Sequence, residues 1–263
     1  MRPSQPKLAI SDGLLGSAAM FTAITFDWGD TLATNYSMPY LATQRAAFGR
    51  LATDMAAAGA KPREDFVAHA LAELAVEWHR SIDLARNPNH QEFDCAALFQ
   101  RLIDAAGPAD PQAVLAARER CEDRLTDTIF PFPETIPTLA ALKARGYRLG
   151  VLSHVPWPGP SCRRWFVRHG LAPYLDFYSL SCEVGWIKPN VAHYQDTARQ
   201  AGCPPDRILH VGDHPLRDVR GGKTFGFRTC LRRTERIYPE EDLDTCGADI
   251  EIIHLSELLN LLP

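Results

Sequence analysis

The chain has 263 residues, of which 46% are hydrophobic and 23% charged, as in an ordinary soluble globular protein. This length allows one large domain or a core domain with a smaller insert. Its formal net charge is −4 and its isoelectric point about 6.1, so the charge does not favour binding to nucleic acid. No apolar run reaches the roughly 18 residues that a membrane span needs. We therefore expect a cytoplasmic protein that works as a monomer or a homodimer.

The distribution of cysteines and arginines argues against several kinds of site. The seven cysteines are widely spread and form no CxxC pair, which favours a reducing compartment over a disulfide framework or a zinc site. Arginines gather at two places, and we interpret both clusters as solvated faces rather than ligand sites. They are Arg163, Arg164 and Arg168, and Arg232, Arg233 and Arg236.

The first structural signals lie in the N-terminal half. We expect residues 1–20 to be a loose extension, because the first buried strand, within "AITF", begins just after Met20. A loop, "DWGDTLAT", follows it. Residues 35–130 show four helical patterns and no convincing strand, which predicts a helical insert. Its apolar stripes include Leu41, Phe48, Leu51 and Met55, and then Val67, Leu71, Leu74 and Trp78.

From residue 131 onward, helix and strand signals alternate. "TIPTLAALKARGY" predicts a helix that ends at Gly146, and "RLGVLSH" a buried strand. Further strands are predicted at "FYSLSC", "RILHVGD", "FRTCLR" and "ADIEII", with helices between them and a last one at "LSELLNLL". Short apolar runs separated by helices indicate a doubly wound, mostly parallel α/β sheet. We expect residues 21–34 and 131–263 to form this core and residues 35–130 an all-helical cap.

Four polar residues fall where predicted strands end. Asp27 closes "AITF", Ser153 closes "LGVL", and Asp213 follows "ILHVG". Lys188 lies in the loop "GWIKPN". Each has an ordinary explanation when taken alone, as a helix cap, a turn residue or an exposed loop residue. Because ligands bind at the carboxyl ends of parallel strands, the four together predict a site at this edge of the sheet.

The ordered set of motifs resembles the haloacid dehalogenase superfamily of hydrolases, most of which are phosphatases. "FDWGDTL" is similar to its first motif, "VLSH" to its second, "IKP" to its third and "VGDHPLRD" to its fourth. The spacings agree with that pattern, and the helical insert is similar to the cap that many members carry after the first motif. The resemblance covers nearly all of residues 21–262.

The resemblance implies a reaction and a role for each motif. Asp27 would attack phosphorus and form an aspartyl-phosphate. Lys188 and Ser153 would bind the phosphoryl group through a positive charge and a hydroxyl. Mg²⁺ prefers oxygen ligands, which Asp27, the backbone carbonyl of Gly29 and Asp213 would supply. Asp218, in the second coordination shell, would hold a metal-bound water or orient Lys188. The expected substrate is a small phosphorylated metabolite.

One position departs from the family's pattern. Most members carry a second aspartate two places after the nucleophile, which protonates the leaving group and then activates water; this chain has Gly29 there and Asp30 one place later. A glycine carbonyl can still bind metal, but it cannot transfer a proton. General acid–base catalysis is typically worth about 10²–10⁴-fold. Candidate substitutes or substrate contacts are Asp30, His154, which is alternatively a loop histidine in water, and, in the insert, His79 and Arg80 beside Glu77.

Other reactions are weighed against the same residues. Phosphonate hydrolases of this superfamily also lack the second aspartate, but they need a cap lysine, and the insert's only lysine, Lys61, reads as an exposed loop residue. Halide-removing members lack the metal-type fourth motif that this chain has. The remaining alternative is a phosphate-ligand sensor or interaction module with little turnover. The retained Asp27, Ser153, Lys188 and Asp213 argue against it.

Overall fold

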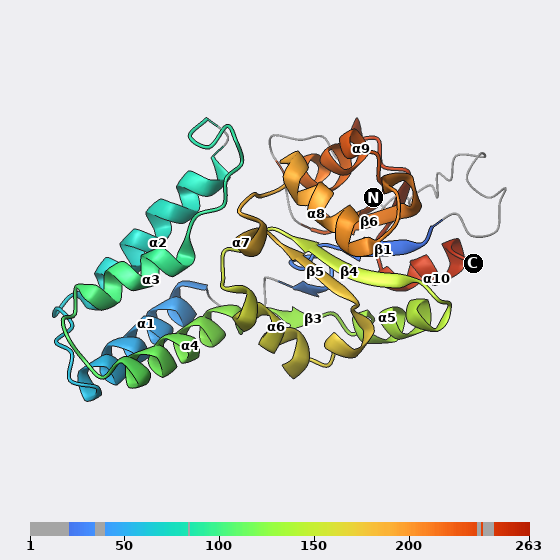
Figure 1. Ribbon diagram of the computed structural model, residues 1–263. Helices are drawn as coiled ribbons and strands as arrows, with labels where there is room; N and C mark the ends of the chain where they lie inside the picture. Colours follow the sequence, from blue (N-terminus) through green and yellow to red (C-terminus); the bar gives the residue numbers. More distant parts are fainter. Residues whose placement is uncertain (1–20, 35–39, 84, 236–237, 239–244) are drawn as a thin grey trace, which may run out of the picture.

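The core of the protein is a six-stranded parallel sheet, seen in a computed structural model that describes residues 21–34, 40–83, 85–235, 238 and 245–263. Figure 1 shows the sheet beside a separate group of helices. The strand order is β5-β4-β1-β6-β7-β8, with every neighbouring pair parallel. The strands are β1 (Ala23–Phe26), β4 (Arg148–Ser153), β5 (Phe177–Leu180), β6 (Ile208–Gly212), β7 (Arg228–Arg232) and β8 (Ile250–Ile252).

Helices cover both faces of this sheet, as the alternation of signals predicts. On one face the side chains of α5, α6 and α10 join the largest apolar cluster, through residues such as Leu139, Trp165 and Leu258. On the other face α8 packs through Tyr194 and Ala201. The core helices are α5 (Thr135–Ala144), α6 (Gly159–Arg168), α7 (Ser181–Val184), α8 (Val191–Ala201), α9 (Gly221–Phe225) and α10 (Leu258–Leu261). Short turns of other helix types are η1 (Ala172–Tyr174), η2 (Pro205–Arg207), the π-helix η3 (Pro215–Arg220) and η5 (Leu255–Glu257). The predicted doubly wound α/β core is confirmed.

Four longer helices form their own apolar core beside the sheet (Figure 1). They are α1 (Tyr40–Ala57), α2 (Phe66–Ile82), α3 (Cys95–Asp104) and α4 (Pro111–Thr126). Asp94 and Asp110 cap α3 and α4 by accepting backbone N–H bonds. Phe48, Leu51 and Met55 are buried as their spacing predicts.

Two residues of the predicted apolar stripes lie outside this core. Leu41 is 59% exposed, and Trp78 is 36% exposed. The ring of Trp78 stacks on that of His154, with 5.4 Å between their centroids, so this end of α2 touches the sheet domain rather than the helical core.

The two connections between the sheet and the four helices run side by side. β2 (Ala33–Thr34) pairs with β3 (Phe130–Pro131) in an antiparallel ribbon, which sequence patterns did not predict. The expected boundaries of the helical insert, at residues 35 and 130, adjoin this ribbon, and the division into domains stays a prediction. No helix in the described part of the chain is both long and apolar enough to cross a membrane.

Candidate active site

The carboxyl end of β1 is the centre of the site, because β1 lies between β4 and β6. Phe26 is in register with Val151 of β4 and with Val211 of β6, so the residues just beyond these positions meet at one edge. The amide of Asp27 donates to the carbonyl of Val211 at 2.9 Å, which continues the sheet by one hydrogen bond. The strands follow one another outward from β1 in both directions, through β4 to β5 and through β6 to β8, and α/β proteins bind ligands at such a switch point.

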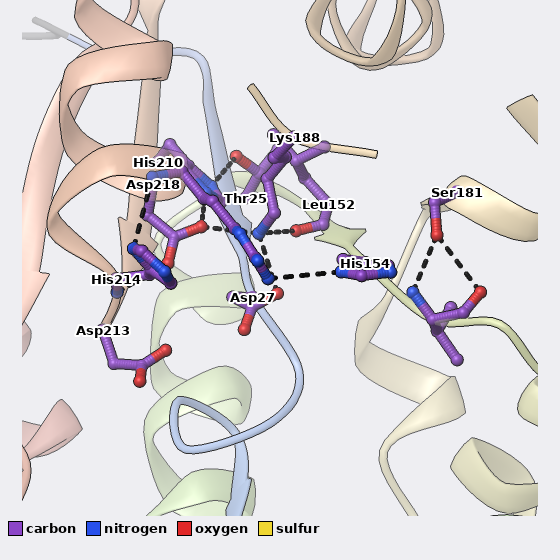
Figure 2. Close-up of polar contacts among 12 residues, drawn as sticks. Thr25, Asp27, Leu152, His154, Ser181, Lys188, His210, Asp213, His214 and Asp218 are labelled. Carbon is purple, nitrogen blue, oxygen red and sulfur yellow. Dashed lines mark hydrogen bonds and ion pairs between the residues drawn. The ribbon is translucent and has the colours of Figure 1, made fainter. Parts of the chain in front are cut away.

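Lys188 connects three elements of the site through its ammonium group. Its Nζ donates to Asp27 Oδ1 at 2.8 Å, to Asp218 Oδ1 at 2.5 Å and to the carbonyl of Leu152 at 2.9 Å (Figure 2). The residue is only 1% exposed. Burial by itself lowers the pKa of Lys188, but the charges of Asp218 and Asp27 outweigh burial and raise it. Lys188 is therefore a charged ammonium fixed between two carboxylates.

Asp218 is held in place on both of its oxygens. Oδ1 lies 3.0 Å from His210 Nε2, in addition to its bond with Lys188, and Oδ2 accepts from the amide of His214 at 2.9 Å. The other ring nitrogen of His210 lies 3.0 Å from the hydroxyl of Thr25. Burial raises the pKa of Asp218, but Lys188 and His210 hold it well below the usual range. This arrangement supports a role for Asp218 in orienting Lys188.

His210 is a site residue that the motif analysis missed. It is completely buried in the middle of β6, and its ring lies between Thr25 and Asp218. A histidine inside the otherwise apolar run "ILHVG" was the available signal, because a buried polar side chain needs hydrogen-bond partners.

The carboxylates at this edge form the metal-type cluster of the site. One oxygen from each of Asp27, Asp213 and Asp218 lies within 4.8 Å of the others. Burial, followed by the charges of Asp218 and Asp27, raises the pKa of Asp213, whose Oδ2 also accepts a hydrogen bond from the Tyr238 hydroxyl. Three carboxylates face one ammonium, so the cluster has an excess of two negative charges when all are ionised. Hard oxygen donors with that excess fit Mg²⁺.

In the loop after Asp27, the backbone at Asp30 has a conformation that favours glycine, the residue most family members carry at this position. Asp30 adopts φ of 56°, the left-handed region, which aspartate tolerates better than most residues. Its amide donates to the carbonyl of Ala33 at 2.7 Å, and the amides of Leu32 and Ala33 donate to the carbonyl of Trp28. Asp30 is 2% exposed. The loop is therefore a tight turn that presents the backbone of Gly29 beside Asp27.

Arg232 holds this loop through hydrogen bonds to its backbone. The interpretation of Arg232 as part of a solvated face is therefore wrong. The residue is 4% exposed, and its guanidinium donates to the carbonyls of Thr31 and Asp30. It also donates to Glu134 Oε1 at 3.0 Å and lies 3.9 Å from the centroid of the Phe132 ring. Arg236 of the same cluster lies outside the described residues.

The remaining candidates divide into two groups. Ser153 is 2% exposed at the end of β4, beside Asp27. The side chain of His154 is 6% exposed, which is not a loop histidine in water, and its Nε2 lies 3.2 Å from Glu92 Oε2. By contrast, His79 and Arg80 are exposed on α2, and Arg80 pairs with Glu77 at 2.6 Å. The contacts described for these two residues do not join them to the carboxylate cluster, and a role for either in the reaction stays a prediction.

Comparisons with known proteins identify the family of this chain. A family model described as a haloacid dehalogenase-like hydrolase matches residues 21–226. A glyceraldehyde 3-phosphate phosphatase of Methanopyrus kandleri is 29% identical over 250 residues, which cover 92% of this chain and 97% of the relative. A protein of the same name from Methanothermobacter thermautotrophicus is 35% identical over 136 residues, 50% of this chain, and the match spans only 58% of that relative's length.

Solved structures show the same fold. A 2-haloacid dehalogenase of Pseudomonas syringae pv. Tomato superposes with a TM-score of 0.63 at 26% identity, covering 92% of this chain and 98% of the other. A haloacid dehalogenase-type phosphatase of Thermococcus onnurineus has a TM-score of 0.61 at 22% identity, covering 92% and 97%. Because the family model matches more than half of its length, the chain belongs to the haloacid dehalogenase-like hydrolases.

Proposed function

We propose that the protein hydrolyses a small phosphate ester in a Mg²⁺-dependent reaction through an aspartyl-phosphate on Asp27. The observation that carries this proposal is the contact of Lys188 Nζ with both Asp27 and Asp218, beside the carboxylate of Asp213. A phosphate ester carries negative charge, and three carboxylates would repel it. A divalent cation held by Asp27, Asp213 and the carbonyl of Gly29 would supply the charge that neutralises this repulsion and polarises the phosphoryl oxygens.

The chain's own residues account for the binding and transfer of the phosphoryl group. A carboxylate oxygen of Asp27 attacks phosphorus, and the bond from phosphorus to the leaving oxygen breaks. Lys188 stabilises the charge on the transferring group, and Asp218 keeps the ammonium in position. The hydroxyl of Ser153, at the end of the neighbouring strand, donates to a phosphoryl oxygen. Water then hydrolyses the aspartyl-phosphate and regenerates Asp27.

The comparisons support a small substrate. Three relatives are named as phosphatases of glyceraldehyde 3-phosphate, a small phosphorylated metabolite. Phosphonate cleavage gains no support, because Lys61 is exposed in the loop between α1 and α2. Several solved structures of the same fold are dehalogenases, among them the one from Pseudomonas syringae pv. Tomato, but the buried Asp213 and Asp218 favour metal-dependent phosphoryl chemistry.

The test is phosphate release from p-nitrophenyl phosphate and glyceraldehyde 3-phosphate, with and without Mg²⁺. We expect turnover that needs Mg²⁺ and is lost in Asp27→Asn, while Asp206→Asn, at an exposed aspartate, retains it. Chloride release from 2-chloropropionate is measured in parallel. Binding of phosphate esters without turnover would instead identify a sensor, and chloride release without phosphate release would identify a dehalogenase.

A further inference from the structure

The contact between the helical insert and the sheet domain contains a buried carboxylate–imidazole pair. Glu92 comes from the segment between α2 and α3, and His154 directly follows Ser153. Glu92 Oε2 lies 3.2 Å from His154 Nε2, and the two side chains are 2% and 6% exposed. The pair therefore joins a cap residue to the residue beside the proposed phosphate-binding serine.

Glu92 is fixed by the sheet domain as well as by its own segment. Its Oε2 accepts from the Ser181 hydroxyl at 2.5 Å, and its Oε1 accepts from the amide of Phe93 at 3.0 Å. Its amide donates to the carbonyl of Gly185 at 3.0 Å. Burial by itself raises the pKa of Glu92, but His154 and these hydrogen bonds lower it. Glu92 is thus a buried anion whose position is set from both sides.

The imidazole is oriented by contacts on three sides. Glu92 faces Nε2, the Trp78 ring stacks against its plane, and Arg217 Nη1 lies 3.3 Å from Nδ1. In Figure 2 His154 lies on the opposite side of Asp27 from Asp213. Nε2 lies at ion-pair distance from the carboxylate of Glu92, while Nδ1 points toward Arg217, which belongs to the fourth motif together with Asp213 and Asp218.

The direction of phosphoryl transfer determines where the leaving oxygen lies, and this oxygen needs a proton. Attack by Asp27 at the strand end is in line with the leaving group, so the leaving oxygen lies farther from the sheet than phosphorus. That is the side covered by the insert, and His154 touches Glu92 and Trp78 of the insert. The backbone of Asp30, in contrast, is bonded to Ala33 and Arg232 of the sheet domain.

We propose that His154, oriented by Glu92, transfers the proton that the residue at position 29 cannot. In the first step Nδ1 of the protonated imidazole gives its proton to the leaving oxygen as the bond to phosphorus breaks, which yields the free alcohol and a neutral imidazole. In the second step Nδ1 takes a proton from the water that attacks the aspartyl-phosphate, which yields phosphate, restores the imidazolium and frees Asp27. Arg217 leaves Nδ1 for the phosphoryl group when substrate binds. The inference rests on the proposed function.

The test compares a poor and a good leaving group in His154→Gln and Glu92→Gln. Glyceraldehyde 3-phosphate releases an alkoxide that needs a proton, whereas p-nitrophenyl phosphate releases a stable anion. The ratio kcat/KM reports the first step alone when that step is irreversible. For His154→Gln we expect kcat/KM to fall by about 10²–10⁴-fold with the sugar phosphate and by less than about tenfold with the aryl ester.

The second step gives an independent readout. With the aryl ester, kcat should fall in His154→Gln and a burst of p-nitrophenolate should precede slow turnover, because the aspartyl-phosphate accumulates. Glu92→Gln should show the same selectivity with a smaller loss. His69→Gln, on α2 away from this pair, is the matched control and should change neither substrate's kinetics.

Each other outcome overturns the inference. Equal losses for both substrates in both variants would mean that the pair only maintains the fold, since unfolding removes both activities alike. A leaving-group-selective loss in Asp30→Asn but not in His154→Gln would assign the proton to Asp30. Absence of Mg²⁺-dependent phosphate release by the unaltered protein from either ester would instead overturn the proposed function, and this inference with it.

Discussion

Replacing Lys188 by methionine removes the ammonium that lies between the buried carboxylate of Asp218 and the partly exposed carboxylate of Asp27, while nearly preserving side-chain volume. Nζ lies 2.8 Å from Asp27 Oδ1 and 2.5 Å from Asp218 Oδ1, and the lysine side chain is 2% exposed. Removing one partner of a buried ion pair typically costs about 3–5 kcal/mol, because the other charge is left uncompensated. We expect the free energy of unfolding of Lys188→Met to fall by about that amount at neutral pH without metal.

A double-mutant cycle measures how much of this loss belongs to the Lys188–Asp218 pair. Urea unfolding is followed by tryptophan fluorescence for Lys188→Met, Asp218→Asn and the double variant. The double variant should be more stable than the sum of the single losses predicts, by about 1–3 kcal/mol. Lys143→Met, which breaks a half-exposed pair with Asp176, should cost no more than about 1 kcal/mol. A loss below about 1 kcal/mol in Lys188→Met, or strict additivity, would refute the view that these charges depend on one another.

Three further predictions concern buried groups around the site. Burial lowers the pKa of His193 from 6.5 to about 3. Between these two pH values only the unfolded chain binds a proton at His193. Each unit by which the pH falls in that window therefore lowers the free energy of unfolding by about 1.4 kcal/mol. Urea unfolding should therefore show a stability loss from about pH 7.5 to 5 that is about 2 kcal/mol smaller in His193→Asn than in the unaltered protein, whereas equal losses would contradict the argument. Arg232→Met should lower the free energy of unfolding by about 3 kcal/mol, because the guanidinium donates hydrogen bonds to two buried carbonyls. Arg233→Met, at a partly exposed neighbour, should cost under about 1 kcal/mol. Equal urea midpoints for the two variants would show that Arg232 does not stabilise the loop. In Gly212→Ala the added Cβ would lie 2.2 Å from Asp218 Cγ. We therefore expect the free energy of unfolding, measured by thermal unfolding, to fall by about 1–3 kcal/mol and kcat to fall as well. An unchanged kcat would show that Asp218 need not keep its position.

The fold could be predicted because its signals are local. Apolar runs such as "AITF" and "ILHVG" are buried in the structure as central strands, and helix ends fall at glycines such as Gly146 and Gly202. The positions of Asp27, Ser153 and Asp213 followed from one topological rule, that parallel strands present their carboxyl ends at a single edge. The ribbon between β2 and β3 was missed because strands of two residues carry no periodic signal.

The partners of the site could not be predicted, because they come together only in three dimensions. Glu92 is one acid among many in an irregular segment, and nothing in the chain near it indicates that it reaches His154. Arg232 looked like part of a basic surface because its neighbours in sequence are also arginines, whereas the last four residues of β7, Arg232 included, are buried in the sheet between β6 and β8. Trp78 has the spacing of a core residue, but it lies at the end of α2 where the helix meets the sheet domain.

The most direct test of the central claim is to trap the phosphorylated enzyme. The protein is mixed with p-nitrophenyl phosphate and Mg²⁺, quenched in acid within the first turnover, digested and examined by mass spectrometry. The account predicts one added phosphoryl group on the peptide that contains Asp27, labile at alkaline pH and absent both in Asp27→Asn and without Mg²⁺. Steady release of phosphate with no label on this peptide, or a label that persists in Asp27→Asn, would contradict it.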